Sequence, residues 1–116
     1  MNAQDSHFDR YGTRLASNAV VTGAAATTET VAAPGLGKKI RVLAWLLSPE
    51  GASVMTWKSA ATAKTGAMLG ATGAQNRADF NPVGWFDCAE NEALNLTVGT
   101  AAANGIVSYA IVEIGA

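Results

Sequence analysis

Short strand-forming runs, separated by turn residues roughly every ten residues, fill the chain from about Asn18 to Ile114. The runs are rich in Val, Ile, Thr and aromatic residues, whereas the breaks are rich in Gly, Pro, Asn and Ser. This rhythm is typical of all-β sandwiches and barrels. It predicts strands over 18–22, 27–33, 38–48, 52–60, 65–69, 77–80, 83–88, 92–98 and 105–114.

The N-terminal segment, residues 1–17, has a different character. It mixes both charge signs with isolated aromatic residues and has neither strand alternation nor a helical stripe. Polar termini are usually disordered unless something ties them down, so we expect a partner or a neighbouring copy to hold this segment. We therefore divide the chain into an extended arm, 1–17, and a β-sandwich domain, 18–116.

Four breaks define the predicted connections. Residues 34–37 (PGLG) separate two strands, and residues 48–51 (SPEG) predict a hairpin loop between the two strongest runs. Asn104-Gly105 predicts a two-residue hairpin turn, because both residues tolerate positive φ. The glycine-rich stretch 65–75 predicts a loop that crosses between sheets.

Two of the predicted strands, over 40–47 and 106–114, carry apolar residues on both faces. In the strand over 92–98, by contrast, one face is polar. A two-sheet sandwich has one interior, so such strands need a second covering layer. That layer is either a loop or the N-terminal segment folded over the sheet, or another subunit. We assign subunit packing to one face of each strand, namely Leu43, Trp45, Leu47, Val107, Tyr109 and Ile111.

The composition disfavours several function classes. The net charge of −1 and the 15% of charged residues provide no basic surface for nucleic acid or for a membrane. No apolar stretch approaches the roughly 20 residues needed to span a bilayer, and residues 1–14 do not resemble a signal peptide. We expect a protein made in the cytoplasm. Ala dominates the 49% of hydrophobic residues, so we expect modest stability and a gain from association.

Residues suited to catalysis are few, since the chain has one His and one Cys. Asp5-Ser6-His7 has the residue types of a catalytic triad, but adjacent residues in an arm cannot hold the triad geometry. We expect Cys88 to be buried as a small hydrophobic residue. The one His and the one Cys are not spaced in the way that metal ligands usually are. We predict no enzymatic activity, no cofactor and no metal. Five acids are candidates for a glycosidase pair, Asp79, Asp87, Glu90, Glu92 and Glu113, but this number is ordinary for a protein surface. Asp87, Glu90 and Glu92 are candidates for a calcium site, but they do not follow the alternating ligand pattern of a calcium loop.

The three tryptophans offer an alternative function. Trp45 and Trp57 sit within apolar runs, where packing in a core or an interface is the common role. Trp85 follows a turn and is the best candidate for an exposed ring. An exposed Trp would suit a carbohydrate- or receptor-binding sandwich.

Several segments resemble those of small virion proteins of tailed bacteriophages, the capsid decoration or cement proteins. The resemblance covers residues 27–114, and the segments that carry it are GKKIRVL (37–43), TWKS (56–59), TGAM (65–68), FNPVGWF (80–86) and EALNL (92–96).

The resemblance implies a jelly-roll-like antiparallel β-sandwich that forms a homotrimer and clamps neighbouring subunits of the major capsid protein. It places the protein on the capsid surface of the virion, as a structural part without enzymatic activity. Because aromatic residues and Arg are enriched at binding hot spots, we assign capsid contact to four residues of the arm, Phe8, Arg10, Tyr11 and Arg14.

Overall fold

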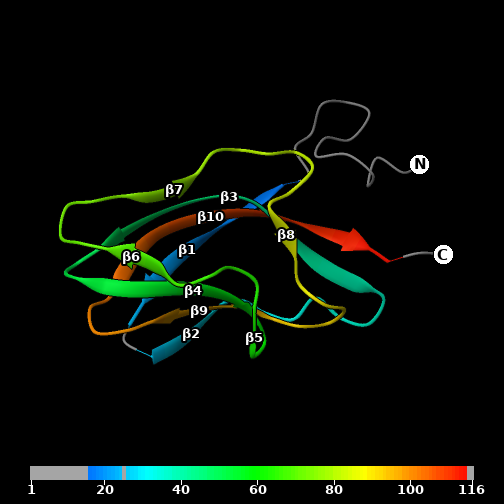
Figure 1. Ribbon diagram of the computed structural model, residues 1–116. Helices are drawn as coiled ribbons and strands as arrows, with labels where there is room; N and C mark the ends of the chain where they lie inside the picture. The colour runs from blue at the N-terminus through cyan, green and yellow to red at the C-terminus, as the bar shows by residue number, and fades with distance from the viewer. Residues whose placement is uncertain (1–15, 25, 115–116) are drawn as a thin grey trace.

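The fold is all-β, as the sequence predicts. The computed structural model describes residues 16–24 and 26–114, and no helix occurs in these ranges. The strands are β1 (Ser17–Gly23), β2 (Ala26–Val31), β3 (Lys38–Pro49), β4 (Ser53–Ser59), β5 (Thr62–Ala63), β6 (Met68–Gly70), β7 (Asn76–Ala78), β8 (Phe86–Asp87), β9 (Leu94–Val98) and β10 (Ala103–Glu113) (Figure 1).

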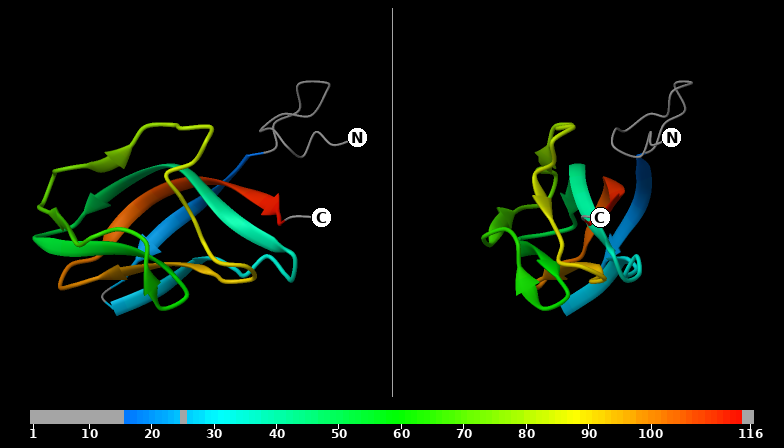
Figure 2. Two further views of the ribbon diagram at one scale, coloured as in Figure 1. Left: turned by 45° about the vertical axis from the view of Figure 1, so that its right-hand side comes forward. Right: turned by 90° about the vertical axis from the view of Figure 1, so that its right-hand side faces the viewer.

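The strands form two antiparallel sheets that pack face to face. Sheet 1 has the order β1-β10-β3-β7, and β8 also pairs with β3. Sheet 2 has the order β2-β9-β4-β5, and β6 also pairs with β4. The two layers are seen in Figure 1, and from two further sides in Figure 2. The predicted β-sandwich is therefore confirmed, while the jelly-roll connectivity stays a prediction.

One hydrophobic core lies between the sheets. Alternate residues of β4 and β9 are buried, as expected for strands with one face on the core. Trp57 of β4 is fully buried and meets Trp45 of β3 edge to face, with ring centroids 5.9 Å apart. Cys88 is buried too, as predicted, and burial raises the pKa of its thiol.

A β-bulge explains why β3 is apolar on both faces. Ser108 of β10 faces Ala44 and Tyr109 faces Val42, so Leu43 has no facing residue on β10. The extra residue shifts the alternation by one position. Ile40 and Val42 before the bulge and Trp45 and Leu47 after it therefore belong to the same core. The bulge turns both sets inward, so these four residues need no second covering layer. Leu43 is fully buried without belonging to this core.

The other two-faced strand, β10, is only partly sheltered. Val107 is fully buried in the core and Tyr109 packs against it. Ile106 and Ile111, by contrast, are 41% and 42% exposed. This strand thus leaves apolar surface open to solvent.

Two of the four predicted connections are wrong. Asn104 and Gly105 lie inside β10, opposite Ser48 and Leu47, and residues 99–102 make the turn between β9 and β10. Residues 48–51 do not close a hairpin either, because β3 belongs to sheet 1 and β4 to sheet 2. Each of these strands pairs with a C-terminal strand instead, β3 with β10 and β4 with β9.

The other two predicted connections are confirmed. Residues 34–37 join β2 to β3 and lead from sheet 2 to sheet 1. The glycine-rich stretch contains β6, and the chain then crosses to sheet 1 through residues 71–75 before β7. The glycine- and proline-rich residues 34–37 and the residues 71–75 after β6 are unpaired, as turn residues usually are.

Candidate interaction surface

The outer face of sheet 1 carries a row of residues that crosses four strands. Val20 faces Ile106, Ile106 faces Leu46, and Leu46 faces Arg77. Residues next to these three in sequence, namely Val21, Val107, Trp45 and Leu47, are buried in the core, so this row points away from it. Val20 is 75% exposed. The row therefore places an apolar stripe on the solvent side of the sheet.

A shallow hollow of about 210 Å³ lies where this row crosses β10, β3 and β7. Ala44, Leu46 and Ile106 contribute apolar walls, and Arg77 and Asp79 contribute charged groups. Arg77 Nη2 lies 3.2 Å from Asp79 Oδ1 in an ion pair whose side chains are mostly exposed. Such a pair adds little stability, so both groups are available to a ligand.

The loop between β7 and β8, residues 79–85, adds a second apolar feature beside the hollow. Phe80, Val83 and Trp85 are each at least half exposed, and Val83 reaches 78%. Trp85 Nε1 donates a hydrogen bond to the carbonyl oxygen of Asp79 at 2.8 Å, which joins the two ends of the loop. We call residues 79–85 the apolar loop.

Backbone hydrogen bonds fix the apolar loop to β3 at the bulge. The N–H of Asn81 donates to the carbonyl oxygen of Leu43 at 2.9 Å, and that of Trp85 donates to the carbonyl oxygen of Val42 at 2.8 Å. The Trp85 ring also lies 6.0 Å from the ring of Trp45, centroid to centroid. The exposed side chains are therefore presented from a rigid segment.

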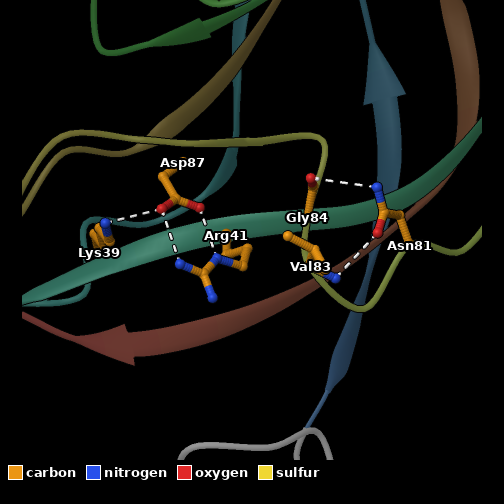
Figure 3. A network of polar contacts seen from close by, with 6 residues as sticks. All are labelled: Lys39, Arg41, Asn81, Val83, Gly84 and Asp87. Atoms are coloured by element: carbon orange, nitrogen blue, oxygen red, sulfur yellow. Dashed lines mark hydrogen bonds and ion pairs between the residues drawn. The ribbon is translucent and has the colours of Figure 1, made fainter.

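A tight turn at Asn81 shapes the tip of the apolar loop (Figure 3). Asn81 Oδ1 accepts a hydrogen bond from the N–H of Val83 at 3.0 Å, in the manner of an Asx turn. Gly84 closes the turn with a φ of 100°, in the left-handed region that favours glycine. A β carbon there would also lie 2.6 Å from Cγ of Arg41. Both the backbone conformation and the lack of space therefore favour glycine at this position.

Beside this turn, Asp87 binds two cationic side chains of β3 (Figure 3). Its Oδ1 lies 2.8 Å from Nε of Arg41, and its Oδ2 lies 3.1 Å from Nη2 of Arg41 and 2.8 Å from Nζ of Lys39. Partial burial would raise the pKa of Asp87, but the hydrogen bonds from Arg41 and Lys39 outweigh it, and the pKa lies below its ordinary value.

We expect Asp87→Asn to lower the free energy of unfolding by about 1 kcal/mol at neutral pH. Because the pKa of Asp87 is lower in the folded chain than in the unfolded one, its stabilising effect is present above the unfolded pKa of about 4. The effect is lost as the pH falls through the folded pKa. Urea unfolding at neutral and at acidic pH measures the difference between variant and wild type.

Asp79→Asn is the matched control, because Asp79 pairs with Arg77 on the exposed surface. It should change stability by less than about 0.5 kcal/mol at either pH. An equal cost for the two variants, or a cost for Asp87→Asn that does not shrink in acid, would contradict the ionic role of Asp87.

Two of the other acids weighed as a catalytic pair, Glu90 and Glu92, have structural partners. Glu90 Oε2 accepts a hydrogen bond from the N–H of Gly37 at 2.7 Å. Glu92 Oε1 accepts one from Ser59 Oγ at 2.6 Å. Residues 16–24 and 26–114 hold no cluster of three or more His, Cys, Asp or Glu side chains that could bind a metal ion. Within the same ranges, no helix is long and apolar enough to cross a membrane.

The structure corrects most of the predicted subunit interface. Leu43, Trp45, Leu47 and Val107 are buried within a single chain, so they cannot also pack against another subunit. The bulge is the physical reason for β3, since it turns Trp45 and Leu47 toward the core. Only Ile111 keeps substantial exposed surface, with Tyr109 half-buried beside the core. For Tyr109 and Ile111 the interface stays a prediction.

The arm residues assigned to capsid contact lie outside the described residues. The predicted exposure of Trp85 is confirmed, because half of its surface is open, while Trp45 and Trp57 are buried. The row through Val20 and Ile106 was missed. Its signal was present in residues 18–22, where Val20 lies between polar Asn18 and Thr22 on the face opposite Ala19 and Val21.

Comparisons of the chain with protein-family models, with curated protein sequences and with solved structures found no match.

Proposed function

We propose that the protein is a structural virion protein of a tailed bacteriophage, which decorates the capsid and stabilises the major capsid shell as a homotrimer. The observation that carries this proposal is the apolar loop, which holds exposed Val83 and Trp85 on a rigid turn. Exposed apolar patches rimmed by polar groups are typical of protein interaction sites. The sequence resemblance supplies the partner, the major capsid protein.

The fixed shape of the apolar loop is consistent with a binding role. A loop already held by hydrogen bonds to Leu43 and Val42 loses little conformational entropy when a partner docks on it. Aromatic side chains such as Trp85 contribute large contact area at interfaces. The loop therefore suits a clamp that must match a preformed surface.

Multivalency then makes weak contacts effective. In a trimer, each bound loop raises the effective concentration of the next one at the shell. The arm would add a second footprint in each copy, through Phe8, Arg10, Tyr11 and Arg14. The protein would be made in the host cytoplasm and act on the outside of the capsid.

Capsid binding tests the proposal with two changes. We expect Val83→Asp to reduce occupancy on purified capsid shells by about tenfold or more, because a charge replaces an apolar contact at the interface. Deleting residues 1–15 should weaken binding as well. Co-sedimentation with shells that lack the protein measures occupancy, and circular dichroism checks that each variant is folded.

Leu36→Asp is the matched control, because Leu36 is 82% exposed in the connection from β2 to β3, away from the apolar loop. It should leave occupancy unchanged. If both the loop variant and the deletion bind shells as the wild type does, the proposal fails.

A carbohydrate- or receptor-binding role on a tail or head fibre is the second candidate. It is favoured by the half-exposed Trp85, whose Nε1 binds the backbone of Asp79 at the edge of the hollow. Titrating oligosaccharides against tryptophan fluorescence tests it, with Trp85→Phe as the control. Quenching in the wild type that disappears in the variant would favour this role, and no quenching would remove it.

A further inference from the structure

β1 is an edge strand whose outer side has no partner strand among the described residues. It pairs with β10 over all of its seven residues, from Ser17 to Gly23, without a register shift. No other strand joins it in sheet 1. In Figure 2, β1 (blue) runs along one side of the molecule. Its outer N–H and C=O groups are therefore placed to pair with another strand.

β1 also lacks the features that usually protect an edge. Its sequence, SNAVVTG, contains no charged residue and no proline, and Val20 projects from it 75% exposed. The edge strand of sheet 2, β2, carries Glu29 and a register shift between Glu29 and Val31. The remaining peripheral strands, β5 to β8, have only two or three residues each. Among the strands in residues 16–24 and 26–114, only β1 offers a long, regular and uncharged edge.

We propose that β1 pairs antiparallel with β1 of a second copy of this chain, about a two-fold axis at Val20. In this register Val20 faces Val20 of the partner subunit, and Ala19 faces Val21 of the partner subunit. Asn18 faces Thr22 of the partner subunit. Apolar residues thus meet apolar ones and polar residues meet polar ones, with no like charges opposed.

The side chains beside the axis fit this register. Asn18 Oδ1 already accepts a hydrogen bond from Ser108 Oγ at 2.6 Å, which leaves its amide N–H₂ to donate to the Thr22 hydroxyl of the partner subunit. Seven facing pairs supply roughly six to eight main-chain hydrogen bonds between copies. The apolar row through Ile106 and Val20 would continue across the axis, because the two-fold keeps both outer faces on one side.

A two-fold contact closes on itself and does not build fibres. It is independent of the proposed capsid role, which uses the apolar loop and the arm. If the chain is also a trimer through another contact, each trimer carries three β1 strands, and these pair two trimers when the two-fold axes are perpendicular to the three-fold axis. In a closed assembly of this kind, as in a dimer of single chains, the β1 contact doubles the mass.

Val20→Lys tests the contact by light scattering on the purified full chain. The two introduced charges would face each other at the axis, so the variant should have half the mass of the wild-type assembly. Leu36→Lys, which changes an equally exposed Leu outside any strand, should keep the wild-type mass. A wild-type monomer, or equal masses for wild type and Val20→Lys, would overturn the proposal whatever the capsid-binding result.

Engineered cysteines test the register. In the proposed pairing Val20→Cys brings two thiols within disulfide range, whereas two copies of Asn18→Cys are offset by four residues, about 13 Å. Oxidised glutathione should convert Val20→Cys to a disulfide-linked dimer on a non-reducing gel, while Asn18→Cys and the wild type, whose Cys88 is buried, stay single chains. Equal cross-linking of the two variants, or none in Val20→Cys, would refute this register.

Discussion

Replacing Gly105 by alanine is expected to abolish the folded state, with a loss of about 3 kcal/mol or more in the free energy of unfolding. A β carbon at Gly105 would overlap the carbonyl oxygen of Leu46 and lie 2.9 Å from its carbonyl carbon. β3 cannot retreat from this clash, because it pairs with β10 on one side and with β7 on the other. Relief would require breaking the central ladder of sheet 1.

Gly66→Ala is the control for this prediction. A β carbon at Gly66 would meet no atom within 4 Å, so the change should leave stability within about 0.5 kcal/mol of the wild type. Urea unfolding followed by tryptophan fluorescence measures both variants. If Gly105→Ala unfolds at the wild-type urea concentration, the close approach of β10 to β3 is wrong.

Trp57→Ala is the second change with a large expected effect, a loss of about 3–5 kcal/mol. Trp57 is the largest fully buried side chain among the described residues, and its ring packs edge to face against Trp45 of the opposite sheet. Truncation would leave a cavity between the sheets that their paired strands cannot close. The loss comes from packing alone, because Nε1 of Trp57 has no hydrogen-bond partner among the described residues.

Two further variants, also measured by urea unfolding, are compared with Trp57→Ala. Trp57→Phe keeps much of the ring and loses no hydrogen bond, so it should cost clearly less than Trp57→Ala. Trp85→Ala should also cost less, because half of the Trp85 side chain is already in water. A cost for Trp57→Ala no greater than that of Trp85→Ala would contradict the central place of Trp57.

Local pattern was sufficient for strands whose pairing keeps one face on the core. The alternation of Leu94, Leu96 and Val98 predicts β9 and its buried face, since in a regular strand successive side chains point to opposite sides. Residues 34–37 break the chain where predicted, because glycine and proline are unsuited to strand pairing. The same logic failed at Asn104-Gly105, where pairing with β3 overrides a favourable turn sequence.

The candidate surface was less predictable than the fold. Trp85 was expected to be exposed from its place after a turn, and it is. The Arg41–Asp87 ion pair joins residues 46 positions apart, and its members show no local sign of meeting. The apolar loop depends on hydrogen bonds to the bulged part of β3, so its rigidity could not be seen from its own sequence.

Fold class could be predicted from the amino-acid sequence, because period-two alternation and turn spacing are local properties of the chain. The register between distant strands, and with it the bulge at Leu43, follows from tertiary packing. That single unpaired residue brings Ile40 and Val42 on one side of it, and Trp45 and Leu47 on the other, into one core. It leaves Val20, Ile106 and the apolar loop, rather than Trp45 and Leu47, as the apolar surface open to partners. Strand register depends on the packing of all strands at once, which no local pattern contains.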